Sequence, residues 1–237
     1  MNPVLAEILQ SRRSLSADGK GTVDVHSTIS ADEGRMLSNL IAQRKPKVSL
    51  EVGLAFGIST LFICEALKQS TPNPQHIVID PAQNAPAYWH GVGLANLERA
   101  GYRGFVEFIE KPSQIALPEL VSAGRKIDFG FIDGEHTFDH VLVDFFFIDQ
   151  LLNVGGIVVL DDAGWPSIRS VARFVASNRS YKVVAHVGSD SDPKSKLSRD
   201  ASPETLQSDK KFGLDGHCIA FEKQANDNRQ CDYFVKF

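Results

Sequence analysis

The sequence predicts an α/β protein built on an open, doubly wound sheet. Two observations carry this prediction. Apolar, β-rich runs alternate along the chain with amphipathic segments of helical periodicity. The runs are also apolar throughout rather than at every second residue, which is typical of parallel strands covered on both faces. Because strands separated by helices are joined by right-handed crossovers, we expect a parallel sheet with helices on both sides.

The N-terminal region, residues 1–46, is expected to be a helical extension of the same domain. Ser30 to Glu33 has the pattern of a capping box, and apolar residues at helical spacing follow it until Lys45 and Pro46: Met36, Leu37, Leu40 and Ile41. A helix should therefore precede the first strand.

Residues 47–237 are expected to form the sheet and its covering helices. Five runs are predicted strands: Val48–Val52, Ile77–Asp80, Phe105–Glu110, Ile127–Asp133 and Ile157–Asp161. A helix is expected at Ser167–Ser177, followed by two closing strands, Tyr181–Val187 and His217–Lys223. Between these, residues 188–211 are rich in Ser, Asp and Lys and lack a periodic apolar face, which predicts a mobile loop, either a lid or an insertion without a role.

Composition limits the classes of function. The 237 residues suit one domain, with 43% hydrophobic and 23% charged residues, as in an ordinary globular protein. A net charge of −4 argues against nucleic acid or an anionic membrane as partner and favours a small molecule. Cys64, Cys218 and Cys231 have no zinc-site or disulfide spacing, and no run resembles a signal peptide or membrane span, so we expect a cytoplasmic protein.

The segment from Ser49 to Thr60 is the most informative, because a strand ends there in a glycine-bearing turn that opens a helix. Gly53 allows a sharp backbone turn, and Gly57 allows a ligand to approach the start of the helix. The spacing is E-x-G-x-x-x-G and not the G-x-G-x-x-G of dinucleotide enzymes, which disfavours NAD. The alternative is that both glycines serve tight packing only.

Asp80 closes the second predicted strand. A carboxylate at this place can accept hydrogen bonds from both ribose hydroxyls of an adenosine that lies across the sheet edge. The alternative is a solvated turn aspartate before Pro81. Together with the glycine turn, Asp80 favours a nucleoside ligand.

These segments resemble the class I S-adenosylmethionine-dependent methyltransferases, and Leu50 to Leu61 resembles their catechol and macrolide O-methyltransferase branch. Three more segments are similar to bacterial members of that branch: Ile79 to Gln83, Trp89 to Leu94 and Phe131 to His136. The resemblance covers about residues 29–223. It implies a Rossmann-like, seven-stranded, mostly parallel sheet with the last strand antiparallel, and S-adenosyl-L-methionine as cofactor.

The resemblance also implies roles for individual residues. Glu51 and the glycines Gly53 and Gly57 should contact the methionine portion of the cofactor, and Ser59 and Asp133 are further expected cofactor contacts. Asp80 should hold the ribose, and Ser113 falls where the family contacts adenine.

Three carboxylates follow the fourth and fifth predicted strands: Asp133, Asp161 and Asp162. Neighbouring strand ends bring them together, which is costly unless a cation or bound substrate compensates the charge, and oxygen ligands suit Mg²⁺ or Ca²⁺. The metal-dependent members that the chain resembles hold at these strand ends a metal that chelates two oxygens of the acceptor. This chain has Asp-Asp where many relatives have Asp-Asn. The alternative is that Asp133 only orients cofactor or substrate and the Asp pair only ends a strand.

Glu135 and His136 lie just beyond Asp133, and either could take the proton of an acceptor hydroxyl. We prefer His136 as the base, although a histidine there could instead contact the cofactor or coordinate the ion.

The sequence therefore predicts O-methylation of a small-molecule hydroxyl with the assistance of a divalent metal. Three other hypotheses stay open: a metal-independent O- or N-methyltransferase, a non-catalytic module that binds the cofactor, and a nicotinamide-dependent oxidoreductase. The acceptor cannot be identified from the sequence, because variable loops determine it. A homodimer is a further expectation.

Overall fold

The computed structural model describes residues 1–85, 88–188, 197 and 202–237. The chain divides into two compact units, Met1–Glu119 and Leu120–Phe237, and each is described by itself.

The first unit contains a small hairpin, three strands of the main sheet and the helices that accompany them. Its strands are β1 (Arg13–Leu15), β2 (Thr22–Asp24), β3 (Val48–Val52), β4 (Gln75–Ile79) and β5 (Val106–Ile109). Its helices are α1 (Pro3–Ser11), α2 (Ala31–Arg44), α3 (Ile58–Ser70), α4 (Val92–Arg99) and the beginning of α5 (Ser113–Ser122), with a short 3₁₀ turn, η1, at Arg103–Phe105.

Strands β3, β4 and β5 are parallel and end level with one another. Val52 pairs with Ile79, and Ile79 pairs with Ile109. The residues that follow these three positions therefore emerge at one edge of the sheet, because parallel strands share the edge at which their carboxyl ends lie.

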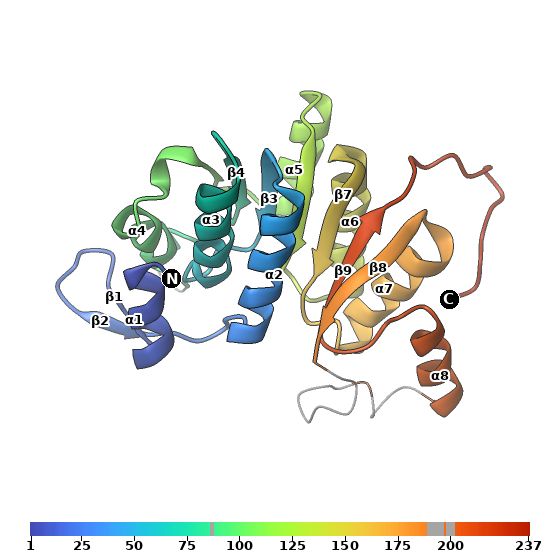
Figure 1. Cartoon of the computed structure of the whole chain (residues 1–237), viewed down its shortest axis with the longest axis horizontal. Helices are drawn as coiled ribbons and strands as arrows, with labels where there is room; N and C mark the ends of the chain where they lie inside the picture. The colour runs from blue at the N-terminus through green and yellow to red at the C-terminus, as the bar shows by residue number, and fades with distance from the viewer. Residues whose placement is uncertain (86–87, 189–196, 198–201) are drawn as a thin grey trace. The chain divides into compact units, whose positions relative to one another are not determined.

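The N-terminal region contains both predicted helix and unpredicted strand. The capping box is confirmed, since the Ser30 hydroxyl accepts from the Glu33 N–H and the Glu33 carboxylate accepts from the Ser30 N–H. Between α1 and α2, however, β1 and β2 pair in an antiparallel hairpin, beside α4 (Figure 1). Its loop includes a turn in which the Gly19 N–H donates to the Ser16 carbonyl, a signal that helical periodicity does not detect.

The second unit contains the other strands of the main sheet, which are β6 (Ile127–Ile132), β7 (Leu152–Leu160), β8 (Tyr181–Val187) and β9 (Cys218–Lys223). Its helices are α6 (Phe138–Leu151), α7 (Pro166–Asn178) and α8 (Pro203–Lys211). β6 is parallel to β7, whereas β9 is antiparallel to both β7 and β8. Its core includes large aromatic side chains that are fully buried: Phe129, Phe131, Phe145 and Phe221.

The predicted fold class is confirmed. The seven strands of the main sheet follow the order β5-β4-β3-β6-β7-β9-β8, and the last strand of the chain is the antiparallel one. The main departure within this sheet is β7, which begins at Leu152 and not at Ile157 because it follows α6 directly.

The predicted loop at 188–211 is wrong for its last part. α8 occupies Pro203–Lys211, where Ser202 caps the helix by accepting from the Thr205 N–H and Pro203 stands in the first turn. Residues 189–196 and 198–201 lie outside the described part of the chain.

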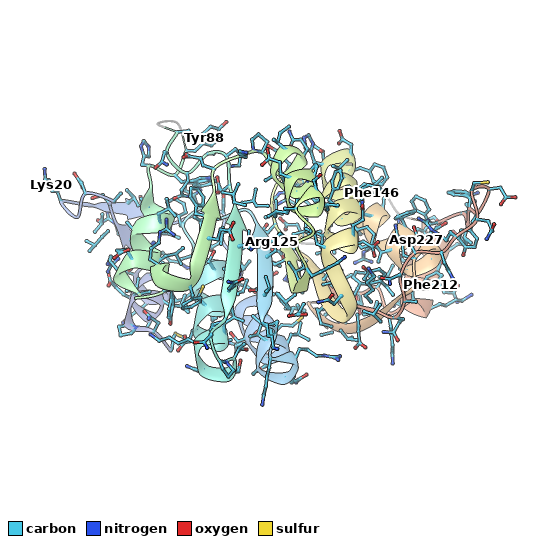
Figure 2. All side chains as sticks on the ribbon, turned by 90° about the horizontal axis from the view of Figure 1, so that it is seen from above. Lys20, Tyr88, Arg125, Phe146, Phe212 and Asp227 are labelled. Atoms are coloured by element: carbon cyan, nitrogen blue, oxygen red, sulfur yellow. The ribbon has the colours of Figure 1, made fainter. Side chains whose placement is uncertain are left out.

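Some aromatic side chains reach the surface. Tyr88, Phe146 and Phe212 are labelled on the outside of the side-chain view (Figure 2), and Phe146 is half exposed on α6 although its neighbour Phe145 is fully buried. Among the described residues, no helix combines the length and the apolar character that crossing a membrane requires.

Candidate cofactor and cation sites

In the first unit, the backbone between β3 and α3 forms the turn that the glycine spacing predicted. Gly53, Ala55 and Gly57 all have left-handed conformations, with φ of 97°, 47° and 81°. The Gly53 N–H donates to the Ile79 carbonyl at 2.9 Å, and the Gly57 N–H donates to the Leu54 carbonyl at 2.7 Å. Glycine takes such conformations at little cost, so the two glycines shape this turn directly.

Asp80, directly after β4, fixes the same turn through hydrogen bonds to its backbone. One carboxylate oxygen, Oδ2, accepts from the N–H groups of Leu54 at 3.0 Å and Ala55 at 2.9 Å. The other oxygen, Oδ1, accepts from the Ala82 N–H at 2.7 Å. A carboxylate has about four acceptor positions, and these three bonds leave one of them, on Oδ1. This position is open to a ribose hydroxyl, and the predicted contact of Asp80 with the ribose stays a prediction.

Two buried amides complete the support of the glycine turn, and sequence reasoning did not single them out. Gln83 donates from Nε2 to the Ala55 carbonyl at 2.9 Å and accepts the Gly93 N–H on Oε1 at 2.9 Å. Asn96 donates from Nδ2 to the Phe56 carbonyl at 3.0 Å. Gly93 is required here, because a Cβ at this position would lie 2.5 Å from the Ala55 carbonyl oxygen.

Glu51 is fully buried below the turn. Its carboxylate accepts hydrogen bonds from the hydroxyls of Ser59 and Thr60 at the start of α3, the latter at 2.6 Å, and lies 3.2 Å from Nε2 of His76. The structure thus connects Glu51 and Ser59 to each other, and both side chains fix where α3 begins.

Aromatic rings gather beside the turn. Phe56 lies in edge contact with Trp89 and with His26 of the N-terminal region, at ring-centroid distances of 5.2 and 5.1 Å. Tyr88 extends from Trp89 toward the surface. Ser113 is the first residue of α5 and is half-buried.

In the second unit, three predicted site residues come together where β6 and β7 end. His136 Nε2 lies 3.4 Å from an oxygen of Asp133 and 3.4 Å from an oxygen of Asp162. One ligand atom from each of the three residues lies within 4.8 Å of the others, and all three side chains are half-buried. We call these residues the cation cluster.

Asp161 and Glu135 do not belong to this cluster, so the expected set of Asp133, Asp161 and Asp162 is revised: His136 takes the third position. The physical reason is the turn after β7. Asp161 still follows the strand, its N–H donating to the Ile132 carbonyl at 3.1 Å, and its side chain is buried. Asp162 adopts a left-handed conformation with φ of 50°, and its carboxylate lies beside His136. Glu135 is exposed.

The charges of the cluster act on His136. The hydrogen bond to Asp133 raises the pKa of His136, burial opposes this, and the carboxylates of Asp162 and Glu135 raise the pKa further. Trp165 lies against the imidazole in edge contact, with ring centroids 5.3 Å apart.

The donor atoms of the cluster suit a divalent cation. Two carboxylates and one imidazole supply oxygen and nitrogen ligands, and the two negative charges offset those of the ion. Carboxylates suit both Mg²⁺ and Mn²⁺, and an imidazole ligand is more typical of transition metals, so Mn²⁺ is a second candidate beside the predicted Mg²⁺.

The segment that contains these residues is similar to known proteins. Residues 50–163 match the family model described as a methyltransferase domain. This part of the chain is thus similar to a methyltransferase domain. The family segment begins inside β3 and ends one residue after Asp162, so it contains the glycine turn, Asp80 and all three residues of the cation cluster.

Two curated relatives and one solved structure show which methyltransferases are similar. The chain is 32% identical over 136 residues to a caffeoyl-CoA O-methyltransferase of Stellaria longipes, covering 56% of this chain and 52% of the relative. It is 27% identical over 162 residues to a flavonoid 3',5'-methyltransferase of Vitis vinifera, covering 65% and 64%. The chain thus spans between about half and two thirds of these relatives.

The solved structure is an O-methyltransferase from Bacillus cereus in complex with SAH, with a TM-score of 0.64 and 19% identity over 94% of this chain and 92% of that one. At this identity the likeness concerns the fold, and it confirms the class I methyltransferase architecture that the sequence predicted.

Proposed function

We propose that this methyltransferase transfers the methyl group of S-adenosylmethionine to a hydroxyl group of a small molecule, with a divalent cation held by Asp133, His136 and Asp162. The observation that carries the proposal is the cation cluster, in which two carboxylates and an imidazole converge at strand ends within the family segment.

The first unit supplies the proposed cofactor site. The turn from Gly53 to Gly57 would lie against the methionine portion, and the remaining acceptor position of Asp80 would take a ribose hydroxyl. Glu51 and Ser59 would support the turn from below, since the carboxylate and the hydroxyl already bond to each other. The Phe56 and Trp89 rings offer an apolar wall, and Ser113 stays the proposed adenine contact.

The chemistry asks little of the protein beyond alignment and removal of one proton. The sulfonium group already activates the methyl, so the chain must hold the acceptor oxygen in line with it. A bound cation would lower the pKa of the acceptor hydroxyl.

The structure changes which residue we propose as base. An imidazole that coordinates an ion cannot accept a proton on the same nitrogen, and Nε2 of His136 is the atom that faces both carboxylates. Glu135 is exposed next to the cluster and takes this role when the cation is bound. His136 remains the base of the metal-independent alternative.

The relatives suggest where to look for the acceptor. Their names refer to caffeoyl-CoA and to a flavonoid, both of which carry aromatic hydroxyls. We propose an aromatic diol as the first acceptor class, because two neighbouring oxygens can both reach one ion. A homodimer and a cytoplasmic location stay predictions.

The test is transfer of labelled methyl from S-adenosylmethionine to a panel of catechols and flavonoids, in chelator, in Mg²⁺ and in Mn²⁺. We expect turnover with either ion and a loss of at least about a hundredfold in chelator. Full turnover in chelator would replace the proposal by the metal-independent alternative. Binding of cofactor without turnover on any acceptor would favour a non-catalytic module, and tighter binding of NAD would favour the oxidoreductase.

A further inference from the structure

Arg169 is a fully buried arginine on α7, and neither the proposed cofactor site nor the cation cluster includes it. Burying a guanidinium is costly unless hydrogen bonds and a counter-ion compensate it. The arrangement around Arg169 shows which parts of the second unit this residue holds together.

Within the described part of the chain, the guanidinium donates to three backbone carbonyls from two segments. Nε donates to Ala163 at 2.9 Å, while Nη1 and Nη2 donate to Leu214 at 3.2 Å and Gly216 at 2.8 Å. The planar fork of an arginine can serve all three at once, which the single ammonium of a lysine cannot.

Asp209, on α8, is the counter-ion and is itself buried. It accepts from Nη1 of Arg169 at 3.1 Å and from Nε and Nη2 of Arg173 at 2.7 and 2.8 Å. Arg173 lies one helical turn after Arg169 on α7, so one carboxylate of α8 pairs with two arginines of α7.

The contact with Ala163 links this ion pair to the cation cluster. Ala163 follows Asp162 directly, its carbonyl accepts from Arg169, and its N–H donates to the His217 carbonyl at 2.7 Å. The N–H and the carbonyl of Ala163, the residue after Asp162, are therefore both fixed by hydrogen bonds. The left-handed conformation of Asp162 needs such support, because it is uncommon for a residue other than glycine.

The first turn of α7 holds a second member of the cluster as well. The Ser167 hydroxyl donates to the His136 carbonyl at 2.8 Å. Asp162 and His136 are thus both connected to α7, and Arg169 connects α7 to α8 and to the segment before β9.

We propose that Arg169, with Asp209 as its counter-ion, is a positioning residue for the cation cluster: it fixes the turn that places the Asp162 carboxylate beside His136. This inference rests on the proposed function, since it assumes that the cluster binds a divalent cation. Residues that orient metal ligands from outside typically change metal affinity by about 10- to 100-fold when they are replaced.

The test compares Arg169→Lys with Arg173→Lys in the full chain. Both replacements lie on α7 and remove an arginine fork from Asp209, but only Arg169 contacts Ala163. Mn²⁺ binding is titrated by the loss of the free-ion electron paramagnetic resonance signal. Circular dichroism and the urea unfolding midpoint report whether each variant is folded, and calorimetry with S-adenosylmethionine measures the cofactor affinity.

We expect Arg169→Lys to weaken Mn²⁺ binding by at least about tenfold and Arg173→Lys by less than about threefold, with unchanged cofactor affinity in both. Equal weakening by the two variants, or none by either, overturns the inference while leaving the proposed cation site intact. If Arg169→Lys does not fold, Asp209→Asn replaces it, and unchanged Mn²⁺ binding in that variant also overturns the inference. If the wild-type chain does not bind Mn²⁺, both the inference and the proposed cation site are overturned. Methyl transfer in chelator then shows separately that the proposed reaction does not depend on a metal.

Discussion

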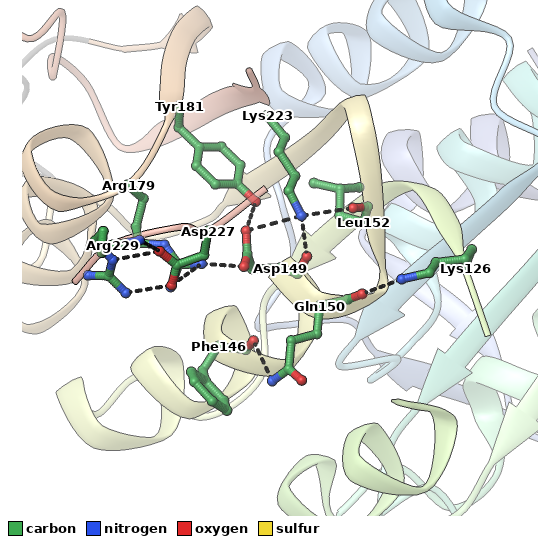
Figure 3. A network of polar contacts seen from close by, with 10 residues as sticks. All are labelled: Lys126, Phe146, Asp149, Gln150, Leu152, Arg179, Tyr181, Lys223, Asp227 and Arg229. Atoms are coloured by element: carbon green, nitrogen blue, oxygen red, sulfur yellow. Dashed lines mark hydrogen bonds and ion pairs between the residues drawn. The ribbon is translucent and has the colours of Figure 1, made fainter. Parts of the chain in front are cut away.

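Two acidic clusters of the second unit lie at opposite ends of β7 and differ in burial and in the groups beside their carboxylates. At the start of the strand, the carboxylate of Asp149 pairs with Arg179 and lies 3.4 Å from the ammonium of Lys223, and Arg179 also pairs with Asp227 (Figure 3). Beyond the end of the strand, Asp133 and Asp162 both lie beside the imidazole of His136.

The network around Asp149 is also more deeply buried than the cation cluster. The side chains of Asp149, Arg179 and Lys223 are 5%, 4% and 3% exposed, whereas those of the cation cluster are 23–34% exposed. Tyr181 donates to Asp149 at 2.6 Å, and Lys223 also donates to the carbonyls of Asp149 and Leu152 at 2.6 and 3.0 Å.

Burial raises the pKa of Tyr181 and lowers that of Lys223, as expected for groups that leave water. In a buried network of paired charges, removal of one partner is strongly destabilising. A half-exposed cluster of two carboxylates and one imidazole is instead open to an ion from solution, so the two clusters should respond differently to mutation.

The largest effect is expected at Asp149. Asp149→Ala removes the carboxylate that two buried cations and Tyr181 contact, which should lower the free energy of unfolding by about 3–5 kcal/mol. Urea denaturation followed by circular dichroism measures this change. Asp139→Ala, on the exposed start of α6, is the control and should change the free energy of unfolding much less than Asp149→Ala. A similar small loss in both variants would contradict the structural role of the Asp149 network.

Asp80 shares one property with each cluster: it is buried, as Asp149 is, yet it keeps one acceptor position for a ligand. In Asp80→Asn an amide N–H would face backbone N–H groups of the glycine turn or of Ala82. We expect S-adenosylmethionine affinity to fall by about 1.5–3 kcal/mol, which is roughly 10- to 100-fold. Calorimetry measures it, and the Mn²⁺ affinity of the same variant should not change. Wild-type cofactor affinity in Asp80→Asn would remove Asp80 from the site.

The smallest effect is a dependence of stability on pH through His136. Because its folded pKa is raised, protonated His136 stabilises the metal-free protein below pH 6.5, the ordinary pKa, and this contribution is lost as pH rises through the folded pKa. With Mn²⁺ the dependence should reverse, since protons compete with the ion for Nε2. Melting temperatures from pH 5 to 9 with and without Mn²⁺, compared with His136→Gln, test this. An identical pH profile in His136→Gln would show that His136 contributes neither to the pH dependence of the metal-free protein nor to that of the Mn²⁺-bound protein.

The sequence predicted the parts of the protein that depend on local pattern. The strands that position the site follow from apolar runs, and the turn from Gly53 to Gly57 follows from glycine spacing. The predicted site residues at strand ends, Asp80 and Asp133, also lie where the runs placed them.

What the sequence could not show depends on side-chain direction and on contacts between distant segments. Nothing in the order Asp161-Asp162 indicates that only the second carboxylate faces His136, because this follows from the left-handed conformation of Asp162. Arg169 likewise has no motif around it, and its partner Asp209 lies 40 residues later on a helix that was predicted as a loop.

The most direct test of the account is Mn²⁺ binding by the metal-free chain in three variants that each remove one carboxylate charge: Asp162→Asn, Asp161→Asn and Asp139→Asn. We predict that Asp162→Asn weakens Mn²⁺ binding by at least about tenfold, because a charged ligand of the ion is lost. Asp161→Asn should have a smaller effect, and Asp139→Asn should leave binding within about twofold of the wild type. Equal affinities in all three variants, or no Mn²⁺ binding by the wild-type chain, would contradict the claim that Asp133, His136 and Asp162 form a cation site.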